Sequence, residues 1–150
     1  MKKSPDIQKL EEMLRSSKLV AGGFMGPDPR GVMEIIDADM AEVSILGQSV
    51  NQIAARMLEI TKAATKGLGT WVDIDEKRMA KVDEARGFVI CPWPHPARFD
   101  KRVTTLKMLD SGKEILWSDL SIHLIAEHGF FEGKDAAFRL EPAELIEMIF

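Results

Sequence analysis

The sequence predicts an α+β domain in which an antiparallel sheet of three to five strands is packed by one long helix, with shorter N- and C-terminal helices. Three observations support this class. Helical patterns fill the first half, strand patterns with a hairpin signal lie between residues 71 and 117, and helical patterns return from residue 118. Because consecutive hairpins build antiparallel sheets, this order is typical of α+β proteins. The chain has 150 residues and no segment resembling a linker, so residues 1–150 are expected to form a single domain.

The first element is a short helix that opens at Ser4-Pro5-Asp6, with Pro5 at a position that suits the first helical turn. Apolar residues then recur at helical spacing: Ile7, Leu10, Met13 and Leu14. Residues 21–31 follow as a loop that contains four glycines and Arg30. The loop matches neither glycine-rich phosphate-binding pattern, so a structural loop is expected.

The longest predicted helix runs from about Asp39 to Lys66. Its apolar stripe recurs every three or four residues: Met40, Val43, Leu46, Val50, Ile53, Met57, Ile60 and Ala64. Gly47 interrupts the stripe at a cost of about 1 kcal/mol, and Gly67 and Gly69 end it. Such a stripe either packs against the sheet or forms the seam of a homodimer.

Short strands are predicted over residues 71–75, 79–82 and 87–91. Residues 103–109 and 113–117 flank Asp110-Ser111-Gly112 and form a hairpin signal. A helix begins after Ser118, a preferred N-cap residue, and ends at His128 before Gly129. A last short helix begins near Pro142.

Composition limits the classes of partner and compartment. The net charge is -4 and the pI about 5.4, which makes a nucleic-acid partner unlikely. The single cysteine cannot form an internal disulfide, and the first residues lack the apolar region of a secretory signal, so a cytoplasmic location is expected. No apolar run approaches the ~20 residues that span a membrane. One basic patch, interpreted as a solvated strand edge, contains Arg98, Lys101, Arg102 and Lys107.

The single cysteine and all three histidines lie in two short segments. Cys91 and His95 belong to the segment Cys91-Pro92-Trp93-Pro94-His95-Pro96, and His123 and His128 belong to the predicted helix after Ser118. Thiolate and imidazole suit metal binding, nucleophilic attack and proton transfer. Three prolines make the first segment stiff and extended, which lowers the entropic cost of ordering its side chains.

On the predicted helix, Asp119, His123 and Glu127 share one arc about 80° wide, and a carboxylate there would fix the orientation of His123. The alternative is a polar strip that faces water. His128 lies about 140° from His123, so the two histidines are not expected to bind one metal from a regular helix. His128 instead suits the negative end of the helix dipole.

Three kinds of chemistry fit these two segments. Cys91 and His95 with His123, or with His128, provide nitrogen and sulfur ligands for a divalent metal such as zinc. A cysteine nucleophile is disfavoured, because Pro92 has no amide proton for an oxyanion hole. A small-molecule pocket requires the fewest specific geometric conditions and is the preferred interpretation. Its expected apolar walls are Trp93, Trp117, Phe130 and Phe131, and its expected polar anchors are His95, His123 and Glu127.

The sequence therefore predicts a domain that binds a small ligand, with a divalent metal as a further option, where residues 91–96 meet the 117–129 helix. The expected ligand-binding residues are Trp93, His95, Trp117, Asp119, His123, Glu127 and Phe131, and the expected metal ligands are Cys91, His95 and His123. The alternative is a homo-oligomeric interaction module that uses the 39–66 helix, with structural histidines. The sequence indicates no substrate, so it does not decide whether the chain is an enzyme.

Overall fold

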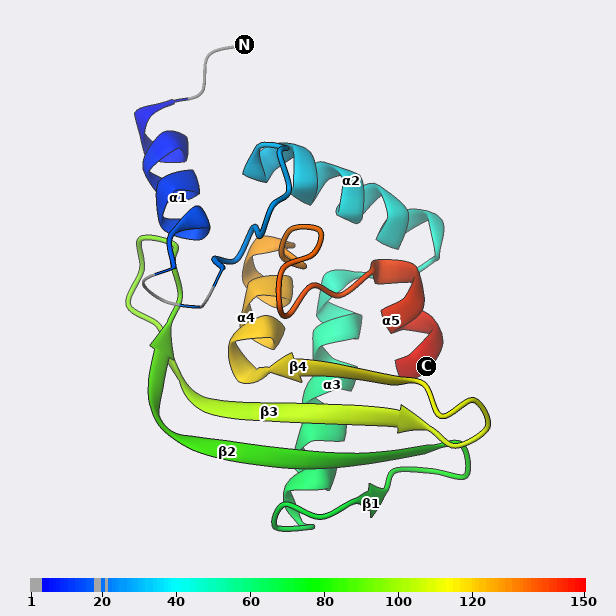
Figure 1. Ribbon diagram of the computed structural model, residues 1–150. Coiled ribbons are helices and arrows are strands. Elements are labelled where there is room, and N and C mark those ends of the chain that lie inside the picture. Colours follow the sequence, from blue (N-terminus) through cyan, green and yellow to red (C-terminus); the bar gives the residue numbers. More distant parts are fainter. Residues whose placement is uncertain (1–3, 18–19, 21) are drawn as a thin grey trace.

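The computed structural model describes residues 4–17, 20 and 22–150. The described chain forms three helices, then four strands, then two helices (Figure 1). In order, these are α1 (Pro5–Arg15), α2 (Val32–Ile45), α3 (Val50–Thr65), β1 (Val72–Asp73), β2 (Arg78–Ile90), β3 (Arg98–Met108), β4 (Glu114–Ser118), α4 (Asp119–His128) and α5 (Pro142–Ile149).

The four strands form one sheet in the order β1-β2-β3-β4, and every neighbouring pair is antiparallel. Helices α3, α4 and α5 lie on the same side of this sheet in Figure 1. The predicted α+β class and the expected number of strands are therefore confirmed. The predicted turn at residues 110–112 joins β3 to β4, as the hairpin signal indicated.

The long β2–β3 hairpin differs from the prediction of two separate strands at 79–82 and 87–91. Both segments belong to β2, except Cys91, and β2 pairs with β3 from Arg78 to Ile90. The register shifts between Ala85 and Phe88, where Gly87 has a φ of 95°. A glycine in this conformation forms a bulge that bends a strand without ending it. The hairpin curves out of the sheet at this end and carries its loop toward α1 and α4 (Figure 1).

The prediction of one helix over residues 39–66 is wrong, because two helices cover this range. Gly47 has a φ of 74°, and the amides of Gly47 and Gln48 donate to the carbonyls of Ser44 and Val43. These two bonds end α2 in a Schellman motif. The Ser49 side chain then caps α3, in a capping box with Gln52. The apolar stripe nevertheless continues, and its α3 part packs against the sheet.

The other predicted helices are confirmed at both ends of the chain. Ser4 caps α1 by accepting a hydrogen bond from the amide of Ile7, and α5 begins at Pro142. The predicted loop at 21–31 is also confirmed over residues 22–31, and Ala21 lies outside the described residues. Within this loop, Arg30 forms an ion pair with the buried carboxylate of Asp28 at 2.8 Å. The charge of Arg30 therefore neutralises a buried acid of the same loop.

Buried apolar side chains form two groups, which we call the sheet core and the helix core. The sheet core lies between the sheet and the helices α3, α4 and α5, and contains Val43, Ile53, Met57, Ile60, Ala64, Ala80, Val82, Leu106, Trp117, Ile125, Phe131, Leu140, Leu145, Met148 and Ile149. The helix core lies between α1, α2, α4 and the β2–β3 loop, and contains Leu10, Leu14, Phe24, Met25, Val32, Ile35, Cys91, Leu120, Leu124 and Phe130. Helix α4 contributes to both cores, so it connects them.

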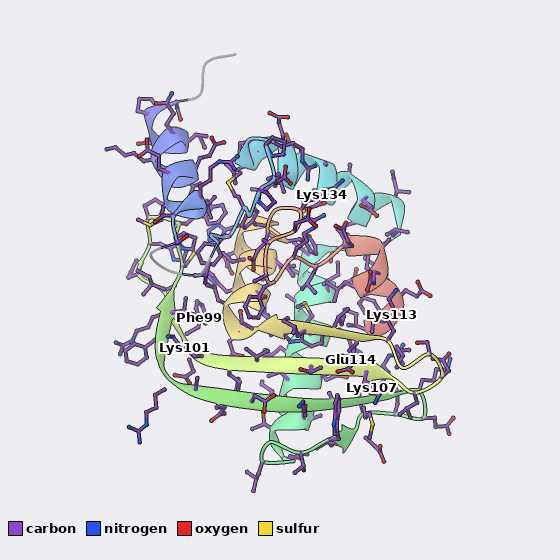
Figure 2. All side chains as sticks on the ribbon, in the orientation of Figure 1. Phe99, Lys101, Lys107, Lys113, Glu114 and Lys134 are labelled. Carbon is purple, nitrogen blue, oxygen red and sulfur yellow. The ribbon has the colours of Figure 1, made fainter. Side chains whose placement is uncertain are left out.

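The basic residues predicted to form one patch do not act together. Lys101 and Lys107 lie near opposite ends of β3 (Figure 2). Arg102 forms an ion pair with Asp119 at 3.0 Å, and Lys107 lies over the ring of Trp71. No helix in the described part of the chain combines the length and the apolar character needed to cross a membrane.

Candidate metal centre

The loop that joins β2 to β3 positions Cys91 and His95. The amide of Cys91 donates to the carbonyl of Ala97 at 3.0 Å, which closes the loop, and the amide of His95 donates to the carbonyl of Trp93 at 2.8 Å. The alternating prolines restrict the backbone between these bonds. The loop therefore holds a thiol and an imidazole in a defined relation before any ligand binds.

Helix α4 positions the other two histidines. Its start is fixed by Ser118, which exchanges capping hydrogen bonds with Ser121. Its end is fixed by Gly129, which has a left-handed φ of 62°. His123 lies in the middle of the helix and His128 is its last residue. Leu120 and Leu124 are buried in the helix core, so the apolar side of α4 fixes how both histidines are presented.

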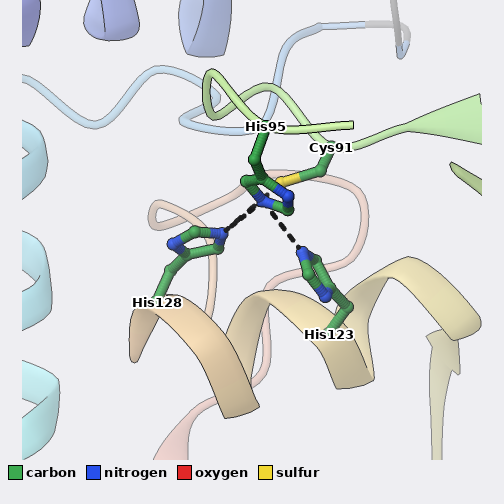
Figure 3. Close-up of side chains that lie close together, drawn as sticks. All are labelled: Cys91, His95, His123 and His128. Carbon is green, nitrogen blue, oxygen red and sulfur yellow. Dashed lines mark hydrogen bonds between the residues drawn. The ribbon is translucent and has the colours of Figure 1, made fainter. Parts of the chain in front are cut away.

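The four side chains converge on one point, which we call the Cys/His site. Figure 3 shows Cys91 and His95 reaching down from the loop while His123 and His128 rise from α4. The Nε2 atom of His95 lies 3.1 Å from Nε2 of His128 and 3.3 Å from Nε2 of His123. The Sγ atom of Cys91 lies 3.5 Å from Nε2 of His128. All four possible ligand atoms lie within 4.8 Å of one another.

The expectation that His123 and His128 cannot serve one site is therefore wrong. The angle of about 140° describes the directions in which the two residues leave the helix axis, and it ignores the length of the imidazole side chains. Their ring centroids are 5.3 Å apart. His128 is also the last residue of the helix, so no following turn covers it, and Trp93 stacks on its ring at 4.0 Å with planes 9° apart. This stacking helps to hold His128 toward the site.

Aromatic side chains surround the imidazoles on two sides. The ring of Trp93 also meets Phe130 edge-on at 5.5 Å, and Phe99 of β3 lies 4.7 Å from the ring of His123. Phe99 was not among the expected site residues, because the sequence did not show that β3 begins beside α4. These contacts exclude water from part of the site and restrict the rotation of the rings.

Burial favours the neutral form of the groups at this site. Burial, together with the nearby His123 and His95, lowers the pKa of His128 to about 4, against the opposing charge of Glu127. Burial, followed by the neighbouring His95, also lowers the pKa of His123. Both imidazoles are therefore neutral at pH 7 and have lone pairs available. Burial raises the pKa of the Cys91 thiol, so a metal ion would have to displace its proton.

The two carboxylates expected to orient His123 have other roles. Asp119 accepts a hydrogen bond from Nε of Arg102 at 3.1 Å. Burial raises the pKa of Asp119, and the pairing with Arg102 opposes this effect. Glu127 is exposed and influences the histidines through its charge alone. Among the described residues, no carboxylate forms a hydrogen bond with an imidazole of the site.

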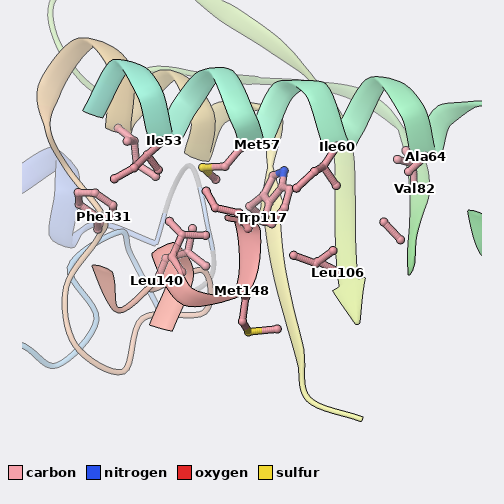
Figure 4. Packing of buried hydrophobic residues seen from close by; sticks show 14 of the residues in the cluster. Ile53, Met57, Ile60, Ala64, Val82, Leu106, Trp117, Phe131, Leu140 and Met148 are labelled. Carbon is pink, nitrogen blue, oxygen red and sulfur yellow. The ribbon is translucent and has the colours of Figure 1, made fainter. Parts of the chain in front are cut away.

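Two of the expected pocket walls lie elsewhere. Trp117 is fully buried in the sheet core, where its indole Nε1 donates to Thr61 at 2.9 Å. Figure 4 shows Trp117 surrounded by α3 side chains such as Met57 and Ile60. Phe131 belongs to the same core. The structure therefore brings Trp93, His95 and His123 together with Cys91, but it does not bring Trp117 or Phe131 to them.

No protein family model, curated protein or solved structure matches this chain. Its function has to be argued from the geometry of its own side chains.

Three of the six distances among the four atoms match the edges of a tetrahedral metal site. Zinc bonds of about 2.0–2.1 Å to nitrogen and about 2.3 Å to sulfur give a tetrahedron with N–N edges of about 3.3 Å and S–N edges of about 3.6 Å. The observed edges are 3.1 and 3.3 Å between nitrogens and 3.5 Å between sulfur and nitrogen. The other three distances are no longer than 4.8 Å, so the side chains would have to close in on a cation at the centre to complete the tetrahedron.

Proposed function

We propose that the chain binds one divalent zinc ion through Cys91, His95, His123 and His128, and that this ion fastens the β2–β3 loop to α4. The supporting observation is that three imidazole Nε2 atoms and one thiol converge on one point. A single imidazole nitrogen offers either one proton or one lone pair. His95 Nε2 therefore cannot satisfy both neighbouring ring nitrogens equally well, whereas a cation accepts a lone pair from all three.

The ligand types favour zinc over other divalent ions. A thiolate with three imidazoles in a tetrahedral arrangement is a typical zinc set, whereas magnesium and calcium prefer oxygen ligands. Four protein ligands fill a tetrahedral coordination sphere, so no position remains for a reactive water molecule. The proposed role of the ion is therefore structural: it connects a stiff loop to a helix that is far away in the sequence.

Cobalt substitution tests this proposal, because Co²⁺ occupies zinc sites and absorbs visible light. We expect the wild-type protein to bind one Co²⁺ per chain, with tetrahedral visible bands and a thiolate-to-metal band in the near ultraviolet. In Cys91→Ser, the thiolate band should disappear. In His123→Ala or His128→Ala, loss of a ligand should weaken Co²⁺ binding by about 100-fold or more.

Glu127→Gln provides the matched control, since this residue lies on the same helix between the two histidines and influences them only through its charge. Its spectrum should equal that of the wild type, and its affinity should change far less than in the histidine variants. Elemental analysis of the purified protein should give one zinc per chain. If no saturable Co²⁺ binding occurs, or if the cysteine and histidine variants bind Co²⁺ as the wild type does, the proposal is wrong and the histidines have a purely structural role.

A further inference from the structure

A surface pocket of about 930 Å³ lies between α1 and the β2–β3 loop. Figure 1 shows α1 beside this loop. The pocket shares Cys91 and His95 with the Cys/His site, but no residue of α4 lines it. Its volume lies within the range of about 300–1,000 Å³ that is usual for small-molecule sites. The space for a ligand is thus beside α1, and the space between the loop and α4 is filled by the Cys/His site.

The walls of this pocket are mostly apolar and partly rigid. Helix α1 contributes Leu10 and Met13, and the loop contributes Trp93 together with three prolines. Leu10 is anchored in the helix core, and the ring of Trp93 is held between His128 and Phe130. Because proline fixes its own φ, this wall needs little ordering when a ligand binds.

The acidic and basic side chains that line the pocket leave it with an excess of positive charge. They are Lys9 and Asp6 on α1 and Arg98 at the start of β3. Within the described part of the chain, neither Lys9 nor Arg98 forms an ion pair, and the guanidinium of Arg98 lies 4.3 Å from the ring centroid of Phe88. Two cations opposed by one carboxylate favour an anionic ligand.

We infer that this pocket binds an amphipathic organic anion, an apolar body that carries one carboxylate. The apolar body would lie against Leu10, Met13 and Trp93, and the carboxylate would be held between Lys9 and Arg98. A guanidinium suits a carboxylate because it offers two parallel hydrogen-bond donors. The inference goes beyond the zinc proposal, because α1 and the loop line the pocket and no residue of α4 does.

Decanoate tests the inference, because it combines an apolar chain with one carboxylate. The three tryptophans supply an internal control in a ¹H–¹⁵N spectrum. The indole signal of Trp93 should shift saturably, while those of Trp117, in the sheet core, and Trp71, beside Lys81 and Lys107, stay unchanged. Decanol has the same chain without the charge, and its affinity should be lower by about tenfold or more.

The double variant Lys9→Gln/Arg98→Gln should weaken decanoate binding by about tenfold while leaving decanol binding unchanged. The variant Lys62→Gln/Lys66→Gln removes the same charge from the last turn and C-cap of α3 and should bind decanoate as the wild type does. Equal binding of decanoate and decanol, shifts at all three indoles, or no saturable shift would each overturn the inference. The Co²⁺ spectrum of the same samples reports the zinc proposal separately, so failure of one is distinguishable from failure of the other.

Discussion

At the scale of single residues, Glu132 stands out because it is an acid inside the protein. Its backbone adopts a left-handed φ of 69°, and the residue is only 5% exposed. Burial raises its pKa to about 8, although the charge of Arg139 opposes the effect. Glu132 is therefore mostly protonated in the folded protein at pH 7, whereas it is ionised in the unfolded chain.

This difference predicts a pH-dependent gain for the neutral variant Glu132→Gln. Between the ordinary pKa of 4.5 and the raised value of about 8, the folded state binds more protons than the unfolded state, so the wild type loses stability as pH rises. Glu132→Gln lacks this loss. Its gain in the free energy of unfolding should approach about 5 kcal/mol above pH 8 and fall below about 1 kcal/mol near pH 5.

Urea unfolding at the two pH values measures this gain, and Glu127→Gln serves as the exposed control with no expected change. A gain for Glu132→Gln that is equal at both pH values would contradict the role assigned to burial.

Some features of the Cys/His site could be predicted from the sequence, and others could not. Clustering of Cys91, His95, His123 and His128 in two segments was visible from the sequence, and so was the option of zinc. The joint use of His123 and His128 was not, because a helical angle describes the backbone and not the reach of a side chain. Trp117 was misplaced for a similar reason: its neighbours in sequence do not show that its indole meets Thr61 of α3.

At the scale of elements, the break between α2 and α3 depends on the left-handed conformation of Gly47. Gly47→Ala should lower the free energy of unfolding by about 1 kcal/mol, because a side chain strains this backbone. The added Cβ meets no atom within 4 Å, so crowding contributes nothing. Gly47→Asn should cost less than Gly47→Ala, since asparagine tolerates the left-handed region better.

Thermal or urea unfolding of the two variants provides the measurement. A Gly47→Ala variant as stable as the wild type would contradict the claim that the break between α2 and α3 depends on the left-handed conformation of Gly47.

The elements also show what the sequence could not predict. Caps and turns are local, so Ser4, Ser118 and the turn at residues 110–112 were located correctly. The meeting of the β2–β3 loop with α4 is not local. It requires the hairpin to bend near Gly87 and to extend beyond the end of β4, where Ser118 pairs with Val103. Neither feature has a signature in the hydrophobic pattern. The predicted meeting of residues 91–96 with the 117–129 helix relied on residue chemistry rather than on topology.

At the scale of the whole molecule, the apolar stripe predicted as a possible dimer seam is largely used within one chain. Ile53, Met57, Ile60 and Ala64 are buried in the sheet core. Met40 and Leu46 are the exposed members of the stripe, at 37% and 42%. A homodimer built on the whole stripe would have to open the sheet core, so the interaction module proposed as an alternative would need a different surface.

The two cores should respond differently to removal of the metal. The zinc ion would attach the β2–β3 loop to α4, and the loop covers the helix core through Cys91 and Trp93. Chelation should therefore accelerate amide hydrogen exchange in residues 91–97 and in α1, while exchange in α3 and around Trp117 stays slow.

Chelation should also lower the thermal stability. If free zinc is present at about 100 times its dissociation constant, its removal lowers the free energy of unfolding by about 2.7 kcal/mol, which corresponds to a fall in Tm of about 5–10 °C.

The double variant Cys91→Ser/His123→Ala supplies the control for this experiment: it lacks two of the four ligands but keeps the stacking of Trp93 on His128, so chelation should change neither its exchange pattern nor its Tm. Equal acceleration in both cores would mean that the ion supports the whole fold, as it does in domains that unfold without metal. No acceleration in either core would mean that contacts such as Trp93 on His128 and Trp93 on Phe130 hold the loop without help. An effect confined to the helix core is expected, since α4 is anchored in the sheet core by Ile125 and keeps its position when the loop detaches.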